Sequence, residues 1–192
     1  DKYNAYALHI EGKLQPKLMN HYDGRVKKHS FRYVRTDPEE RYIKIGQWVL
    51  FRVFDEVTKK TALLKQTPKA SMFGHNLLFE GFTISQVVKA KDSKADFIYV
   101  KENYQQSPDL YAINEVGEEY KLSSTNPQQN QYTWGTSELY KWKAFTGKME
   151  EGVLYKPENF DPTKKYPMIL YFYETHSNTL HSYIPPTPTG SR

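Results

Sequence analysis

Several stretches in the first half of the chain have the hydrophobic pattern of β-strands. Residues 31–35, FRYVR, alternate apolar and polar side chains, and residues 47–55, QWVLFRVFD, form the most apolar stretch of this half. Successive side chains of a strand point to opposite faces of a sheet, so this pattern predicts strands with at least one buried face. A polar turn at 56–60 leads into residues 61–65, which predicts a hairpin.

Two further hairpins carry a glycine at the turn. In residues 3–18, Tyr6, Leu8 and Ile10 alternate with smaller or polar residues, Gly12 marks the turn, and Leu14 begins the return. Residues 96–122 read as a strand, a polar loop closed by Ser107-Pro108-Asp109, a strand at 110–114, a turn at 115–117 and a last strand. Glycine adopts the positive φ angle that tight turns require.

The repetition of such units predicts how residues 1–137 fold. Further strands are expected at 76–79 and 82–89, with a loop at 21–25 and very little helix. Antiparallel units that recur at roughly 40 to 50 residues are typical of propeller blades. The sequence therefore predicts partial blades of a β-propeller. An open propeller has unpaired sheet edges, so we expect these edges to be covered by the rest of the same polypeptide or by another copy.

The pattern changes within residues 151–174. A short strand is expected at 153–156, and after a polar stretch rich in proline and lysine the run 168–173, MILYFY, is apolar at every position. An apolar run without alternation indicates a strand buried on both faces, as in the centre of an α/β sheet. The alternative is one more buried strand of an all-β domain.

Two units follow from this change. The polar stretch 126–131 has no hydrophobic period and is the best linker candidate, and a hairpin is expected between 140 and 155 with its turn at Gly147. We assign residues 1–137 to β-propeller blades and residues 138–192 to the start of a second domain. The proline-rich end is expected to be a loop.

Composition narrows the choice of function. The 192 residues include 16 Tyr, 10 Phe and 3 Trp, which favours sheets. The net charge of +5 arises from 27 basic and 22 acidic residues scattered along the chain, which is typical of a solvated surface. No cysteine is present, which excludes disulfides and thiolate chemistry. No apolar run approaches the roughly 18 residues that span a bilayer, so no membrane partner is expected.

Four stretches, taken in order, carry a family resemblance. They are SPDLYAIN (107–114), KLSSTNPQ (121–128), ELYKWKAFTGK (138–148) and GVLYKPENFDPTKKYPMILYFYE (152–174). Their succession resembles the prolyl oligopeptidase family of serine peptidases, especially its dipeptidyl-peptidase-like branch. In that family a β-propeller precedes an α/β-hydrolase domain, so the resemblance implies a mainly β chain: a partial propeller followed by the opening hairpin and strand of an α/β-hydrolase domain.

The resemblance also implies what the chain contains of the active site. A tyrosine at the end of the matching strand contributes its hydroxyl to the oxyanion hole in the family, and Tyr173 occupies that position. The nucleophile of the family lies in a Gly-x-Ser-x-Gly turn, followed by Asp and His, and this chain has no such turn. We therefore expect a piece of a longer enzyme that cleaves peptides, inactive by itself. It begins without Met or a signal segment; an exported or periplasmic parent fits the resemblance.

Three other readings are compatible with parts of the sequence. A binding module for peptide or carbohydrate would use Tyr and Trp on open sheets as stacking surfaces. Glu174, His176 and His181 combine the ligand types of zinc, but no regular element would hold them together, so neither a metal nor another cofactor is expected. Nucleic-acid binding is disfavoured because alternation places the aromatic side chains of 31–35 opposite the basic ones.

Overall fold

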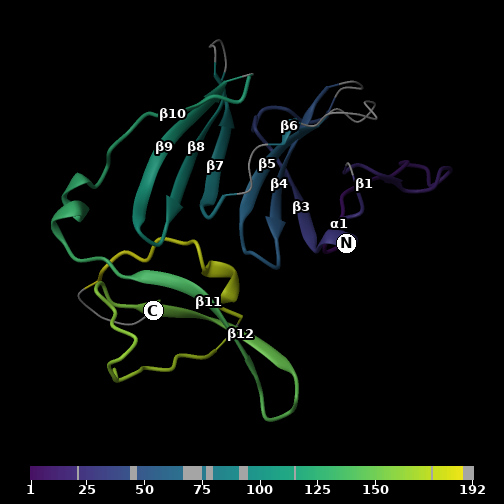
Figure 1. Ribbon diagram of the computed structural model, residues 1–192. Coiled ribbons are helices and arrows are strands. Elements are labelled where there is room, and N and C mark those ends of the chain that lie inside the picture. Colours follow the sequence, from purple (N-terminus) through teal and green to yellow (C-terminus); the bar gives the residue numbers. More distant parts are fainter. Residues whose placement is uncertain are drawn as a thin grey trace.

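The computed structural model describes residues 1–20, 22–43, 47–66, 75–76, 80–90, 95–114, 116–173 and 175–187. Within these ranges the strands form antiparallel sheets, two of four strands and two of two strands (Figure 1). Helix in the described residues is confined to α1 (Gly24–Lys27) and the 3-10 turns η1 (Pro127–Gln131) and η2 (Ser177–Thr179). The expectation of a mainly β chain with little helix is confirmed.

The first four-stranded sheet follows chain order. It consists of β3 (His29–Val34), β4 (Val49–Asp55), β5 (Thr61–Gln66) and β6 (His75–Asn76). The Asp55 carboxylate fixes the turn after β4, since it accepts hydrogen bonds from the backbone N–H of Val57 at 2.8 Å and the Thr58 hydroxyl at 2.6 Å. The strands expected at 31–35, 47–55 and 61–65 are confirmed. Of the strand expected at 76–79, residues 77–79 lie outside the described residues.

The second four-stranded sheet repeats this arrangement. It consists of β7 (Thr83–Lys89), β8 (Ala95–Asn103), β9 (Gln106–Asn114) and β10 (Glu119–Lys121), each paired with its neighbour in sequence. The loop expected at Ser107-Pro108-Asp109 is wrong, because these residues belong to β9. Pro108 has no N–H to donate, and it is tolerated beside a register shift between Lys101 and Asn103 on the paired strand.

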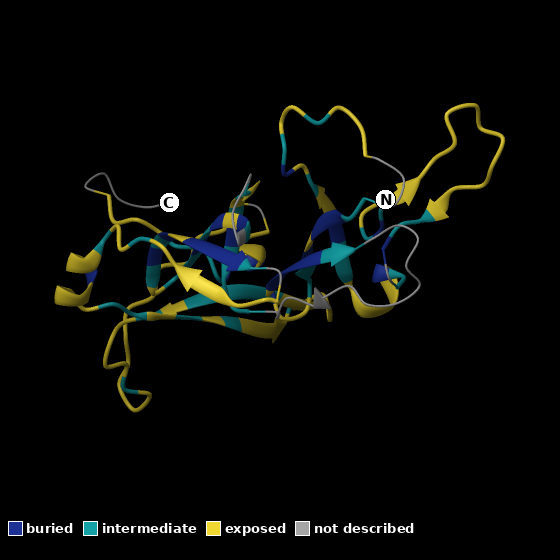
Figure 2. Ribbon diagram, turned by 90° about the horizontal axis from the view of Figure 1, so that it is seen from above, coloured by how far each residue is buried: buried dark blue, intermediate teal, exposed yellow. Residues whose placement is uncertain are grey.

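The two four-stranded sheets pack against each other through one face each. Leu50 and Leu63 of the first sheet share a core with Ile84 and Phe97 of the second, and these side chains are almost completely buried. Figure 1 shows the two sheets side by side, and Figure 2 shows their buried strands at the centre of the molecule. Burial of each large apolar side chain contributes about 1.5–3 kcal/mol, so this shared core holds the sheets together.

A charged cluster lies at one end of the shared core. The Lys101 ammonium is 2.6 Å from Glu80 and 2.8 Å from Glu119, and the Lys101 side chain is only 6% exposed. The Tyr99 hydroxyl also donates to Glu119 at 2.5 Å. Glu80 forms a β-bridge with Thr61 of the first sheet. Lys101 therefore joins the two sheets by an ion-pair network in which each buried polar group has a partner.

The other face of the first sheet is covered by the N-terminal residues. Phe31, Val53 and Leu64 form a second buried cluster, against which Ala5 and Met19 pack. Ala5 and Met19 lie beside the short pair β1 (Tyr6–Ala7) and β2 (Lys17–Leu18). The hairpin expected at 3–18 is confirmed, with Gly12 at a φ of +68°. Its strands are shorter than expected, because Leu8, Ile10 and Leu14 are exposed and pack on no core.

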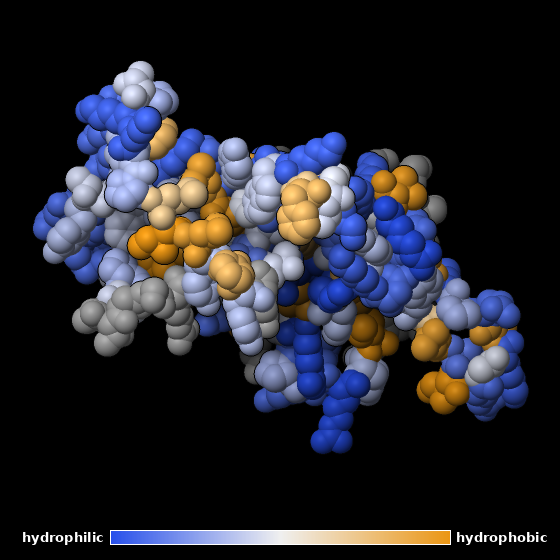
Figure 3. Space-filling model, turned by 90° about the horizontal axis from the view of Figure 1, so that it is seen from below, coloured by the Kyte–Doolittle hydropathy of each residue, from blue (hydrophilic) through white to orange (hydrophobic). Residues whose placement is uncertain are grey.

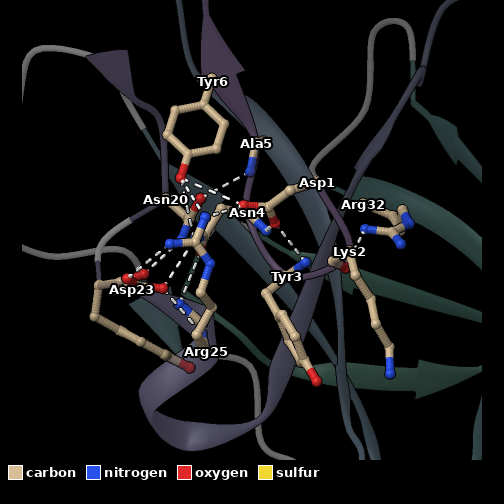
Figure 4. Close-up of polar contacts among 12 residues, drawn as sticks. Asp1, Lys2, Tyr3, Asn4, Ala5, Tyr6, Asn20, Asp23, Arg25 and Arg32 are labelled. Carbon is tan, nitrogen blue, oxygen red and sulfur yellow. Dashed lines mark hydrogen bonds and ion pairs between the residues drawn. The ribbon is translucent and has the colours of Figure 1, made fainter. Parts of the chain in front are cut away.

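Two buried asparagines hold this N-terminal segment in place (Figure 4). The Asn4 side-chain oxygen accepts hydrogen bonds from the Asn20 amide and from the Gly24 backbone N–H, both at 2.8 Å. The Asn4 amide donates to Asp23, whose carboxylate caps α1 by accepting from the Arg25 N–H. Of the loop expected at 21–25, residue 21 lies outside the described residues, and residues 22–25 contain the start of a helical turn, stabilised by its N-cap.

The last described strands form a separate hairpin. β11 (Thr136–Lys143) and β12 (Met149–Lys156) pair along their whole length, and the turn between them has Gly147 at a φ of +84°. This confirms the hairpin expected between 140 and 155 and the strand at 153–156. The linker candidate 126–131 is occupied by η1, in which the Gln129 side chain is buried and donates to the Gln105 carbonyl.

The buried strand expected at 168–173 is wrong for this chain. These residues belong to no strand, and each side chain from Met168 to Tyr173 is at least 60% exposed. A strand buried on both faces needs neighbouring strands and two covering layers. Among the described residues, no strand follows β12 to supply them. Figure 3 shows several apolar groups at the surface on the underside of the molecule.

Candidate functional site

The most elaborate set of contacts between distant parts of the chain lies where residues 175–187, here called the strap, cross the ends of the two four-stranded sheets. The strap and the hairpin β11–β12 contact three segments of the sheets: the β4–β5 turn, the start of β7 with Gly81 before it, and the β8–β9 turn. We call this region the junction. Its contacting residues are Thr58, Lys59, Gly81, Thr83, Glu102, Tyr104, Gln105, Trp134, Ser137, Glu151, Tyr155, Ser177, Leu180, His181 and Tyr183.

A buried ion pair links the first sheet to the hairpin. Lys59 has a φ of +63° at the end of the β4–β5 turn, and this conformation points its 5% exposed side chain at Glu151 of β12, 2.5 Å away. Burial alone would raise the pKa of Glu151, but the interactions with Lys59 and Ser177 outweigh it and hold the pKa below its ordinary value. Ser177 Oγ forms no hydrogen bond of normal geometry, so Lys59 is the main partner of this carboxylate.

Four aromatic side chains form the other half of the junction. The rings of Trp134 and Tyr183 stack with their centroids 5.6 Å apart and an interplanar angle of 7°. Tyr104, in the β8–β9 turn, packs on Tyr155 of β12 at 5.0 Å and accepts a hydrogen bond from the Trp134 indole through its carbonyl oxygen. Aromatic pairs of this kind add about 0.5–1.5 kcal/mol beyond their buried area. They fasten the second sheet to both the hairpin and the strap.

His181 fixes the strap between the two sheets. Its Nε2 atom is 3.2 Å from the Thr58 carbonyl oxygen, and its ring lies against Gly81, where an added Cβ atom would be 3.1 Å from the His181 Cε1 atom. The His181 carbonyl oxygen accepts from the Thr83 hydroxyl at 3.1 Å. Burial lowers the pKa of the imidazole. The hydrogen bond to the Thr58 carbonyl opposes this effect in part, and the positive charge of Lys60 adds to it, so the pKa lies below its ordinary value. The neutral ring is therefore the form that fits the junction.

Glu102 is a second titratable group with a displaced pKa that contacts the strap. The Tyr183 backbone N–H donates to its carboxylate across 3.4 Å, a long hydrogen bond. Burial raises the pKa of Glu102, and this one donor only partly opposes the effect. A carboxylate and a histidine with displaced pKa values beside aromatic rings make the junction the best candidate for a functional region in the described residues.

The residue singled out from the sequence lies elsewhere. Tyr173 is 81% exposed, at the end of the unpaired run 168–173. The nearest ring contact of this run joins Tyr171 to His176, with centroids 5.2 Å apart. The two serines of the strap, Ser177 and Ser182, lie at Glu151 and Thr83 respectively. Glu174 and Ser191 lie outside the described residues. No part of an oxyanion hole is assembled around Tyr173 within the described residues.

The structure also bears on the zinc ligands weighed from the sequence. His176 contacts Tyr171, whereas His181 is bound to Thr58. In the part of the chain that the structure describes, no group of three or more His, Asp or Glu side chains is placed to hold a metal ion. In the same residues, no helix has the length and apolar character needed to cross a membrane.

Sequence reasoning missed the junction residues Lys59 and His181. Lys59 stands in a polar turn, where its sequence context gives no sign that the side chain is buried, and His181 was considered only as a metal ligand. Gly81 was a usable signal, because an isolated glycine before a strand often marks a close approach of another group. The chain matches no model of a known protein family, no curated protein and no solved structure.

Proposed function

We propose that the chain belongs to a serine peptidase of the prolyl oligopeptidase family, in which the two four-stranded sheets are consecutive propeller blades and the hairpin opens the peptidase domain. The observation that carries the proposal is the junction. A second unit begins at β11 and is fastened to the turn ends of both sheets by Lys59 and by the Tyr104 group of aromatic rings. The ordered sequence resemblance supports the same division at about residue 137.

The packing of the sheets supports the propeller part of the proposal. Each sheet follows chain order and the two share one core, as neighbouring blades do. The opposite face of the second sheet carries an apolar row across its strands: Val88 pairs with Ile98, Ile98 with Ala112, and Ala112 with Tyr120. Three of these four side chains are exposed. A further blade would cover this row, and the open edges would meet the rest of the polypeptide or another copy.

In the full enzyme, the blades would admit or recognise peptide substrates and the peptidase domain would cleave them. The serine nucleophile, with its Asp and His, would come from residues beyond this chain. The exposed run 168–173 would enter the central sheet of that domain as its strand. Tyr173 would then stand at the strand end, where its hydroxyl could donate to the oxyanion that forms on the scissile carbonyl.

The substitution Tyr173→Phe tests the proposed site in the full-length protein. It removes only the hydroxyl, so we expect kcat on a prolyl peptide substrate to fall by about tenfold or more, with the free energy of unfolding nearly unchanged. Tyr171→Phe is the matched control in the same run and should leave kcat unchanged. An unaltered kcat in the Tyr173 variant would assign this residue to packing alone.

The reaction class has its own test. A serine-directed fluorophosphonate should label the full-length protein at a serine outside residues 1–192, and the 192-residue chain should be neither labelled nor active. A full-length protein that is not labelled would contradict the peptidase proposal. It would favour the second candidate, a non-catalytic module that binds peptide or carbohydrate on aromatic rings such as the stacked and exposed pair Tyr140 and Trp142.

A further inference from the structure

The contacts of His181 make the docking of the strap sensitive to the protonation of this one side chain. The imidazole ring is held on both sides, by the Thr58 carbonyl oxygen at 3.2 Å from Nε2 and by the backbone of Gly81. A Cβ atom added at Gly81 would crowd the ring at 3.1 Å from Cε1, so the ring lies close to the backbone at this glycine. Leu180, the preceding residue, is 6% exposed, and its carbonyl oxygen accepts from Ser137 of β11 at 3.0 Å. The strap is thus packed on both units at this point.

The charged groups around this position favour the neutral ring. The neighbouring elements carry Lys59 and Lys60 in the β4–β5 turn, Glu80 beside Gly81, Glu102 on β8 and Glu151 on β12. Lys59 is bound to Glu151 and Glu80 to Lys101, which leaves these carboxylates engaged by other cations. Lys60 acts directly on the imidazole and disfavours its protonation. A proton added to His181 would therefore sit on a half-buried ring near Lys60, and no carboxylate is among the groups that shift the pKa of this ring.

We propose that the strap is a pH-sensitive latch, in which neutral His181 locks residues 175–187 across the ends of both sheets and protonation of His181 releases them. Release would break two contacts that hold the hairpin β11–β12 to the strap. Ser137 of β11 would lose the Leu180 carbonyl oxygen, and Trp134, just before β11, would lose its stacking on Tyr183. The Lys59–Glu151 pair would remain and keep the hairpin tethered. The proposal concerns the 192-residue chain and holds whether or not the parent is a peptidase.

The sign of the effect follows from proton linkage. The pKa of docked His181 lies below the ordinary value of 6.5, so the released strap binds the proton more tightly. Docking is therefore strongest above about pH 6.5 and weakens as the pH falls toward the docked-state pKa, by up to about tenfold per pH unit for a single proton. Glu102 acts in the opposite direction, because its raised pKa favours docking as the pH falls.

Hydrogen exchange of the strap amides tests the latch. The amides of Thr179, Leu180 and Ser182 are hydrogen-bonded within the strap and report on its opening. In the 192-residue chain we measure their opening equilibrium between pH 5 and pH 8, corrected for intrinsic exchange, with amides of β9 as an internal reference. We expect opening to increase as the pH falls below about 6.5 while β9 stays protected. A strap whose opening does not change with pH would overturn the proposal.

Three variants separate His181 from its neighbours. His181→Gln keeps a hydrogen-bond donor for the Thr58 carbonyl and removes the imidazole titration, so its opening should no longer increase as the pH falls; only the opposite effect of Glu102 should remain. Lys59→Met should leave the opening of the strap and its pH dependence nearly unchanged, because the Lys59–Glu151 pair is present whether the strap is docked or released. Glu102→Gln should make the pH dependence steeper. A His181→Gln chain that retains the pH dependence of the original would refute the role of His181.

The His181→Gln substitution could open the strap at all pH values, and its pH dependence would then carry no information. Direct titration of the His181 ring in the original chain provides a second test for that case. The proton resonances of the His181 ring should titrate with a midpoint below 6.5 in the original chain, and Lys60→Ala should raise that midpoint. A midpoint at or above 6.5 would overturn the proposal whatever the variants show.

Discussion

Two apolar stretches of similar composition lie in opposite environments. Residues 110–114, LYAIN, form the end of β9, where Tyr111, Ala112 and Ile113 are buried between paired strands. Residues 168–173, MILYFY, are more apolar, yet they belong to no strand and are exposed. The difference teaches that apolar character alone does not produce a strand. β9 has a partner on each side and a second sheet on one face, whereas the later run has no strand beside it in the described residues.

The largest expected effect concerns the core that the two sheets share. Phe97 is 1% exposed, packs edge-on against Trp48 with ring centroids 5.3 Å apart, and faces the first sheet from β8. Phe97→Ala leaves a cavity in this core and should lower the free energy of unfolding by about 3–5 kcal/mol, measured by urea denaturation. A loss below about 1 kcal/mol would mean that the sheets do not share a well-packed core.

The contrast between residues 110–114 and 168–173 also explains how much of the fold could be predicted from the sequence. Alternation and turn glycines were sufficient for β4, β5, β8 and the hairpin β11–β12, because in these elements local pattern and final burial agree. Pro108 misled the prediction, since a proline usually ends a strand and here it lies at an irregular register. The run 168–173 misled it more strongly, because burial on both faces depends on partners that a local pattern cannot reveal.

The candidate site was harder to predict than the fold. The position of Tyr173 came from a family resemblance, and its role depends on a sheet that the described residues do not contain. The junction, in contrast, is formed by groups that lie far apart in sequence, such as the Thr83 hydroxyl and the His181 carbonyl oxygen, which are 98 residues apart. The burial of Lys59 depends on a positive φ angle at a non-glycine residue, which no period in the sequence indicates.

The next effect in size tests the charged cluster that joins the sheets. Lys101→Met removes the cation between Glu80 and Glu119, which leaves two carboxylates close together with no shared partner. We expect the free energy of unfolding at pH 7 to fall by about 2 kcal/mol, measured by urea denaturation. Lys164→Met is the matched control, because Lys164 forms an exposed ion pair with Asp161 at 3.5 Å and should give no measurable change.

Alkaline pH should weaken the same cluster. Burial raises the pKa of Tyr99, and the bonds of Lys101 to Glu119 and Glu80 outweigh burial and raise the pKa of Lys101. Both pKa values are higher in the folded chain, so the stability they contribute is complete below the ordinary values of 10.0 and 10.5 and is lost as the pH rises above them.

Unfolding measured from pH 8 to pH 11 should therefore show a decline that begins near pH 10. Tyr99→Phe keeps the ring and removes the titrating hydroxyl, so the decline should become shallower in this variant. Lys101→Met should reduce it as well. The alkaline decline would have another origin if both variants kept the slope of the original chain.

The smallest expected change in the free energy of unfolding concerns the exposed residues 168–173, in contrast to the buried core. Phe172→Ala removes the same ring as Phe97→Ala, but Phe172 is 81% exposed, so the free energy of unfolding of the 192-residue chain should change by less than about 0.5 kcal/mol. A loss of several kcal/mol would show that the run is packed after all. In a full-length protein in which the run enters a central strand, the identical substitution should instead cost about 3–5 kcal/mol. The difference between the two values would measure how much of this residue's burial depends on partners outside the 192 residues.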